Sequence, residues 1–268
     1  MKKILAKIKA FIRKILGKTA ADIIVPITVV KKWDECTKSS NWTGRNAAKR
    51  IMNILSPNMS DAAFNERYNW AKARGVDHFN VFITNKADGE AAGYSIYGKN
   101  FAQSNGPDKN FCKVMEKRIQ KMVDDGFGVV LWMMADDSNA WAKSVNFDKM
   151  CKDVKDLGWF KLASAVVVGL EVDEYWSAAQ VSNYCKILKK HSGLKVGVHQ
   201  TSNRADFVKF GDLAYLQVPP GTSQAAIANF IKKVKGSKPV CMFEMERQED
   251  RKRSEAALKA GAFSVGNW

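Results

Sequence analysis

The stretch that most constrains the fold is residues 162–177, LASAVVVGLEVDEYWS, in which a solid apolar run breaks abruptly into acidic residues. A valine-rich run of this length, bounded by turn residues, is typical of a strand that is buried on both faces of a parallel sheet. Parallel α/β folds place their chemistry at the carboxyl ends of the strands, where Glu171, Asp173 and Glu174 follow. Capping of the next helix explains Asp173 or Glu174 but explains Glu171 poorly, which indicates a functional carboxylate.

Seven further apolar runs have the pattern of strands, and segments with a helical pattern lie between most of them. The strands recur about every thirty residues along the chain. The eight strands are expected at residues 50–57, 78–85, 127–138, 162–170, 195–201, 212–220, 238–247 and 262–268. The helices are expected at about 60–75, 108–125, 146–157, 177–192, 222–235 and 251–260, and a long loop at 86–108. Repeated βαβ units with eight strands predict an α/β fold, a single (β/α)8 TIM-like barrel over residues 50–268.

A basic amphipathic helix is expected at the N-terminus, residues 1–20, followed by a lead-in segment at 21–49. In residues 1–18, MKKILAKIKAFIRKILGK, apolar side chains recur at helical spacing and lysines and one arginine cover the other face. The segment is too short to span a bilayer and lacks the uninterrupted apolar core of a cleaved signal peptide. The charge pattern favours binding at an anionic membrane surface. The alternative is that the helix packs on the barrel in place of an eighth helix, for which no sequence follows the last strand.

The formal net charge of +16 is the strongest bulk property, and seven of the positive charges lie in residues 1–18. Such a charge suits nucleic acid, anionic lipid or the acidic polymers of a bacterial envelope. No nucleic-acid-binding motif accompanies it, so nucleic acid is not the expected partner. The five cysteines, Cys36, Cys112, Cys151, Cys185 and Cys241, lack metal-ligand spacing and predict free thiols in a reducing cytoplasm. Three scattered histidines predict no zinc site, and no cofactor is expected.

Glutamates end the fourth and seventh predicted strands, which lie on opposite sides of the mouth of an eight-stranded barrel. Glycoside hydrolysis needs two carboxyl groups that flank one bond, one as acid and one as nucleophile or base. Glu171 and Glu244 are the favoured catalytic pair. Glu174 is a rival to Glu171, and Glu246 is a rival to Glu244 because it shares a strand face with it.

On this basis the chain resembles the TIM-barrel glycoside hydrolases of the four-seven clan. That clan carries its acid/base glutamate at the end of strand four and its nucleophile at the end of strand seven, so the resemblance implies these roles for Glu171 and Glu244. It covers roughly residues 50–268 and rests on architecture and two positions. The clan usually has an Asn-Glu pair at the end of strand four, whereas this chain has Leu170-Glu171, and Glu174 therefore stays open as the acid/base.

Further residues at strand ends and in the long loop are candidates for contacts to a sugar. The polar candidates are Asp136, Asp173, His199, Gln217 and Arg247. The aromatic candidates, whose flat faces can stack on sugar rings, are Trp132, Tyr94, Tyr97, Trp176 and Trp268.

The sequence thus favours an enzyme that cleaves bacterial envelope polysaccharide or peptidoglycan, brought to an anionic surface by its basic helix and of phage or prophage origin. Its expected place is a membrane or envelope surface, or a virion. A non-catalytic glycan-binding or virion structural barrel is the second hypothesis, because barrels support many functions. A third is a divalent metal held by Asp136, Glu171, Asp173 and Glu244.

Overall fold

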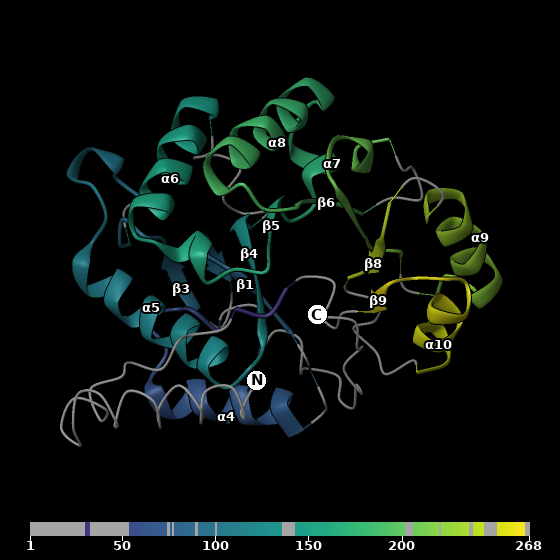
Figure 1. Cartoon of the computed structure of the whole chain (residues 1–268), viewed down its shortest axis with the longest axis horizontal. Helices are drawn as coiled ribbons and strands as arrows, with labels where there is room; N and C mark the ends of the chain where they lie inside the picture. The colour runs from purple at the N-terminus through teal and green to yellow at the C-terminus, as the bar shows by residue number, and fades with distance from the viewer. Residues whose placement is uncertain are drawn as a thin grey trace, which may run out of the picture.

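Figure 1 shows the computed structural model of the chain, in which helices surround one curled sheet. The structure describes residues 30–32, 54–73, 76, 78–88, 91–99, 101–135, 143–201, 206–219, 221–235, 238–243 and 251–265. The predicted amphipathic helix at 1–20 and all of the lead-in segment except residues 30–32 lie outside these ranges. Those two predictions therefore stay untested.

One parallel sheet forms the centre of the described chain. Its seven strands lie in the order β1 (His78–Phe82), β4 (Gly128–Met134), β5 (Ala165–Gly169), β6 (Val196–Gln200), β7 (Leu213–Leu216), β8 (Val240–Met242) and β9 (Ser264–Val265). Around it lie α4 (Asp61–Ala73), α5 (Lys109–Asp124), α6 (Ser144–Asp156), α7 (Val172–Tyr175), α8 (Ala178–Ser192), α9 (Gln224–Lys235) and α10 (Arg251–Lys259) (Figure 1). The sheet curls into half a barrel, which confirms the predicted α/β TIM-like architecture.

The first predicted strand is wrong where the structure describes it. Residues 54–57 form turns, and residues 50–53 lie outside the described ranges. The buried guanidinium of Arg118 on α5 donates hydrogen bonds to the carbonyls of Ser56 and Met59, and the Met59 N–H donates to Ser56 O at 3.0 Å. These bonds occupy backbone groups that a sheet ladder would need.

The predicted loop at 86–108 also differs from the structure, because it contains an antiparallel hairpin. The hairpin pairs β2 (Asn85–Asp88) with β3 (Ala91–Tyr94), and a short 3-10 turn, η2 (Gln103–Asn105), follows it. Two further 3-10 turns are η4 (Trp159–Lys161) and η5 (Val208–Phe210). The hairpin is anchored to the barrel because the Tyr94 hydroxyl donates to the carbonyl of Phe82 at 3.0 Å.

The six helices predicted between residues 60 and 260 are confirmed, and local capping explains where several of them begin. The Ser60 hydroxyl accepts the Ala63 N–H at 3.1 Å before α4, and the Asp108 carboxylate accepts two N–H groups at the start of α5. Ser177 and Gln180 form a capping box at the start of α8. Side chains that accept otherwise unpaired N–H groups fix helix starts locally, which is why the sequence reveals them.

Buried side chains form two clusters on the two sides of the sheet. Along β4, Val129 and Leu131 belong to the larger outer cluster under the helices, whereas Val130 and Trp132 belong to the inner cluster. This alternation follows from the two-residue period of a strand. Because both faces of the sheet are apolar, its strands are near-continuous hydrophobic runs in the sequence.

Trp132 is the centre of the inner cluster. Its ring centroid lies 4.4 Å from that of Phe243 and 5.2 Å from that of Tyr215, and its indole N–H donates to Asn80 Oδ1 at 3.1 Å. Gly197 provides the space beside Tyr215, because a Cβ at residue 197 would lie 2.7 Å from the tyrosine ring. The interior is therefore a packed aromatic core whose upper layer forms the floor of the mouth, which is the end of the barrel where the strands finish.

Four cysteines fall within the described residues, and Cys112, Cys151, Cys185 and Cys241 are all buried free thiols. Burial raises the pKa of the Cys112 and Cys185 thiols to about 12. Among the described helices, none combines the length and apolarity that a bilayer crossing needs.

Candidate active site at the carboxyl ends of the strands

Glu171 lies two residues beyond the end of β5, where the backbone turns sharply into α7. Its φ of 51° and ψ of 42° place it in the left-handed region, which is uncommon for a residue other than glycine. The Glu171 N–H donates to His199 Nδ1 on the neighbouring strand β6 at 2.8 Å. This hydrogen bond helps to offset a backbone cost of about 1 kcal/mol or more. A strained, well-anchored turn thus holds Glu171 at the mouth.

His199 is completely buried and faces the inner cluster, with its ring centroid 5.4 Å from those of both Trp132 and Phe243. Because Nδ1 accepts a hydrogen bond, the neutral ring carries its proton on Nε2. Nε2 is buried and has no hydrogen-bond partner among the described residues. Burial lowers the pKa of His199 from an ordinary value of 6.5 to about 3. The ring is therefore a neutral donor beneath the mouth.

The depressed pKa of His199 predicts acid sensitivity of the fold. The unfolded chain protonates this histidine below pH 6.5 while the folded chain does so only near pH 3, so stability falls as the pH falls through this window. At pH 5 the loss amounts to about 2 kcal/mol. A His199→Asn variant keeps an acceptor near the position of Nδ1 and should lack this loss. Urea denaturation at pH 7 and pH 5 checks it, and parallel pH dependences for the two proteins would contradict the assignment.

Asp173 and Glu174 lie on α7 and interact with the residue after β6. Asp173 Oδ1 accepts the backbone N–H of Thr201 at 2.9 Å, and the Thr201 hydroxyl lies 2.9 Å from Glu174 Oε1. These contacts join α7 to the end of β6. The Glu174 side chain is exposed, whereas that of Glu171, the favoured acid/base, is only partly exposed.

Gln217 directly follows β7 and reaches the mouth from the same strand face as Tyr215. Its backbone N–H donates to Gln200 O at 3.0 Å, which continues the strand pairing by one residue. Its Oε1 is buried and has no hydrogen-bond partner among the described residues. Gln217 Oε1 and His199 Nε2 are thus a buried acceptor and a buried donor on adjacent strands, beneath the mouth.

The structure places the predicted aromatic residues mainly in packing roles. Trp132 lies in the inner cluster, whereas Tyr94, Tyr97 and Trp176 are buried in the outer one. The Tyr97 hydroxyl donates to Asp153 on α6 at 2.6 Å, and burial raises the pKa of this tyrosine. None of these rings has the exposed face that stacking on a sugar requires, so the structure does not bring them to the mouth as a binding platform.

Five of the predicted site residues lie outside the described residues: Asp136, Glu244, Glu246, Arg247 and Trp268. Their assignments, including that of Glu244 as one catalytic carboxylate, stay predictions. The same holds for a metal held by Asp136, Glu171, Asp173 and Glu244. Within the described chain, no group of three metal-ligating side chains is placed to hold an ion.

Two residues at the mouth were not candidates from the sequence. Tyr175 on α7 is 40% exposed, which is unusual for a tyrosine in this chain, and it lies in the same short helix as Asp173 and Glu174. Thr201 joins α7 to β6. The sequence offered a signal for Tyr175, because this aromatic residue lies between a group of acidic residues and the N-cap of the next helix. No local pattern around Thr201 indicates a role at the mouth.

No protein-family model matches the chain, and no curated protein matches it. Solved structures do. A glycoside hydrolase of family 5 from Bacteroides vulgatus matches 86% of this chain with a TM-score of 0.57 at 13% identity, and this chain covers 57% of that one. A family 1 β-glucosidase from Thermotoga maritima matches 89% of each chain with a TM-score of 0.54 at 9% identity.

A broad-specificity endoglucanase from an uncultured bacterium is a third similar structure, with a TM-score of 0.54 at 8% identity over 93% of this chain and 91% of that one. The first of these structures is considerably longer than this chain, which spans little more than half of it. The identities are too low to show a shared activity. What the comparisons establish is the fold: this chain has the architecture of the glycoside-hydrolase TIM barrels.

Proposed function

We propose that the chain is a glycoside hydrolase that cleaves bacterial envelope polysaccharide or peptidoglycan with a pair of carboxylates, Glu171 and Glu244. The observation that supports this most is a connection across the mouth. Glu171 is held by His199, and the His199 ring contacts Phe243, the residue that precedes Glu244 in the sequence. The strands concerned, β5 and β8, are separated by β6 and β7, which is the same three-strand step that separates strands four and seven.

This step does not depend on how the strands are counted. The first predicted strand is a turn in its described part, so β5 is the third strand of the observed sheet and β8 is the sixth. Carboxyl groups three strands apart can flank one glycosidic bond across a barrel mouth. In this proposal Glu171 is the acid/base and Glu244 the nucleophile or base, while His199 holds the turn that carries Glu171.

The high positive charge supports the choice of an envelope substrate, because anionic envelope polymers attract a protein with a net charge of +16. We include in the proposal a phage or prophage origin and action at an envelope surface to which residues 1–18 bind. Tyr175, exposed beside the mouth, is the described aromatic side chain best placed to contact a sugar ring.

The proposal is tested by incubating the full chain with isolated peptidoglycan and envelope polysaccharides and measuring the release of reducing ends. Release that is insensitive to EDTA supports the carboxylate mechanism, whereas loss of activity with EDTA favours the metal hypothesis. Binding to the glycan without cleavage would overturn the enzymatic proposal in favour of a glycan-binding barrel. For an active enzyme, proton NMR of the first-formed anomer gives the stereochemical outcome, and carboxyl groups about 5 Å apart correspond to retention.

A further inference from the structure

A hollow rimmed by lysines opens at the end of the barrel opposite the mouth. It has a volume of about 520 Å³ and lies beside the amino ends of β5 and β6. Lys31, Lys32, Lys161 and Lys195 line it, and none of its ten lining residues is acidic. The segment that carries Lys31 is held there because the Ser164 hydroxyl donates to the Lys31 carbonyl at 2.6 Å.

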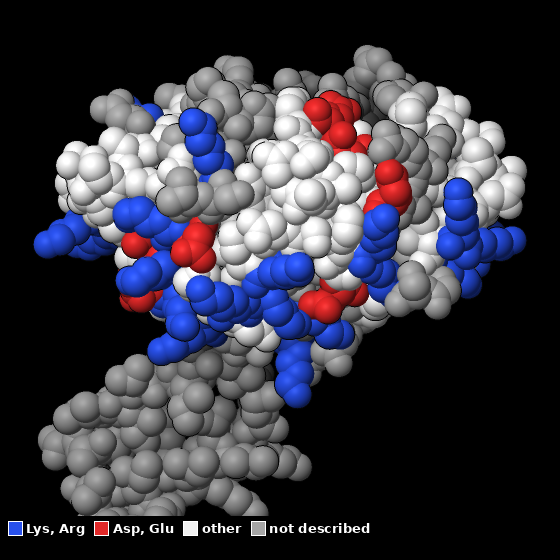
Figure 2. All heavy atoms as spheres, turned by 90° about the horizontal axis from the view of Figure 1, so that it is seen from above, with Lys and Arg blue, Asp and Glu red and all other residues white. Residues whose placement is uncertain are grey.

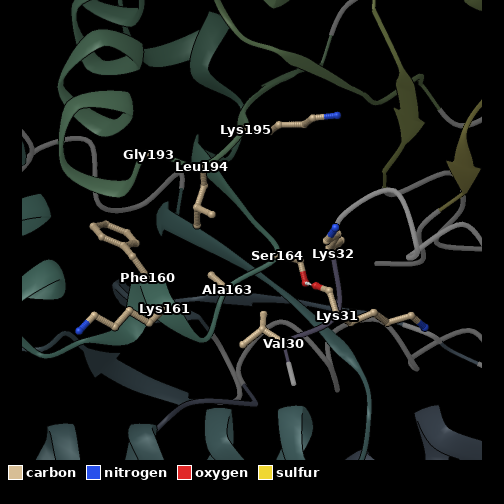
Figure 3. A pocket seen from close by; sticks show the side chains of 10 residues that line it. All are labelled: Val30, Lys31, Lys32, Phe160, Lys161, Ala163, Ser164, Gly193, Leu194 and Lys195. Atoms are coloured by element: carbon tan, nitrogen blue, oxygen red, sulfur yellow. Dashed lines mark hydrogen bonds between the residues drawn. The ribbon is translucent and has the colours of Figure 1, made fainter. Parts of the chain in front are cut away.

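The arrangement of side chains separates an apolar centre from a cationic rim. Figure 3 shows Val30, Ala163 and Leu194 in the middle of the hollow, while the side chains of Lys31, Lys161 and Lys195 extend outward. Because the ammonium groups diverge, they are poorly placed to surround one small anion. They are well placed to reach several anionic groups that are spread over a surface. The apolar stems of the lysines and the apolar centre of the hollow then face the layer beneath those anionic groups.

The surroundings of the hollow are also rich in lysine. Helices run back against the strands of a TIM barrel, so their last turns lie at this end, and α8 ends with Lys189 and Lys190. Asp212 and Asp148 partly neutralise these two, at 3.0 Å and 4.0 Å. Figure 2 shows that lysine and arginine side chains gather toward one end of the molecule. The lysines of the rim and the lysines that end α8 thus lie at the same end of the barrel.

We propose that this hollow and its lysine rim bind the anionic headgroups of a phospholipid membrane. An extended planar array of phosphates matches both the diverging cations and the apolar centre. The sequence adds a geometric argument, because eleven residues, 19–29, connect the basic segment 1–18 to Val30 in the hollow. Such a connection spans at most about 40 Å, so both basic parts can contact the same membrane.

This proposal gives the barrel a defined orientation and does not rest on the proposed function. With its amino-end face on the lipid, the barrel has its mouth directed away from the membrane. Phosphate-bearing soluble polymers share the same charge chemistry, but they would not use the apolar centre of the hollow. The membrane proposal is therefore distinguished from them by experiment.

The test measures flotation of the full chain with vesicles of phosphatidylglycerol and phosphatidylcholine, using pure phosphatidylcholine as the neutral reference. The double variant Lys161→Glu, Lys195→Glu is expected to bind the anionic vesicles at least tenfold more weakly, since each lysine near such a surface contributes measurably. The control Lys109→Glu, Lys113→Glu makes the same charge change at exposed positions in the first turns of α5, outside the hollow, and is expected to bind within threefold of wild type.

Three outcomes would overturn the proposal: unchanged vesicle binding by the first variant, equal weakening by both variants, or preferential binding of soluble polyphosphate over vesicles. Hydrogen exchange measured on the vesicle-bound protein reports which face of the barrel contacts the membrane. Protection on vesicle binding is expected at residues 160–164 and 193–195 and not at 171–176. Protection confined to the mouth would contradict the orientation directly.

Discussion

Glu171→Gln is expected to lower the rate of glycan cleavage by two or more orders of magnitude while the protein stays folded, and Glu244→Gln should do the same. A glutamine is nearly isosteric with glutamate but cannot donate a catalytic proton or act as a nucleophile, and such losses typically have this size. The backbone N–H of Glu171, and not its side chain, holds the turn to His199, so the substitution should leave this contact intact. Initial rates on the cleaved glycan provide the measurement, and circular dichroism verifies the fold.

The rival glutamates provide the matched controls. Glu174→Gln removes a carboxylate three residues away on α7, and Glu246→Gln removes the glutamate that the sequence offers as the alternative to Glu244. We expect both controls to retain most of the activity. If Glu171→Gln and Glu244→Gln both cleave at the wild-type rate, the assignment is wrong and the roles pass to the rivals.

Arg118→Ala is expected to lower the free energy of unfolding by about 3 kcal/mol or more, since it leaves buried polar groups without partners. The side chain is 2% exposed, its guanidinium lies 4.9 Å from the Phe64 ring, and it binds the carbonyls of Ser56 and Met59. These contacts connect α5 to the turn before α4. Urea denaturation measures the effect.

The neighbouring residue offers a control for Arg118. Lys117 forms an ion pair with Asp61 at 2.8 Å, but both side chains are largely exposed to solvent. Lys117→Ala should therefore leave the free energy of unfolding nearly unchanged, because water screens such pairs. An Arg118→Ala variant no less stable than Lys117→Ala would show that the buried contacts contribute little.

The sequence by itself determined the elements whose causes are local. Continuous apolar runs such as AVVVG in β5 predicted strands buried on both faces, and Ser60, Asp108 and Ser177 marked helix starts, because a cap accepts N–H groups only two or three residues away. The same alternation of elements predicted a TIM-like barrel and placed Glu171 at a carboxyl end.

Only the tertiary structure decided the features that depend on contacts between distant residues. Arg118 keeps residues 54–57 out of the sheet. Tyr94 and Tyr97, which the sequence predicted as sugar contacts, are buried, and their hydroxyls donate to the Phe82 carbonyl and the Asp153 carboxylate. The pairing of Glu171 with His199 across adjacent strands and the lysine rim formed by residues 31, 32, 161 and 195 have the same origin. Each joins groups at least twelve residues apart, and no local pattern specifies which of many polar groups will meet when the chain folds.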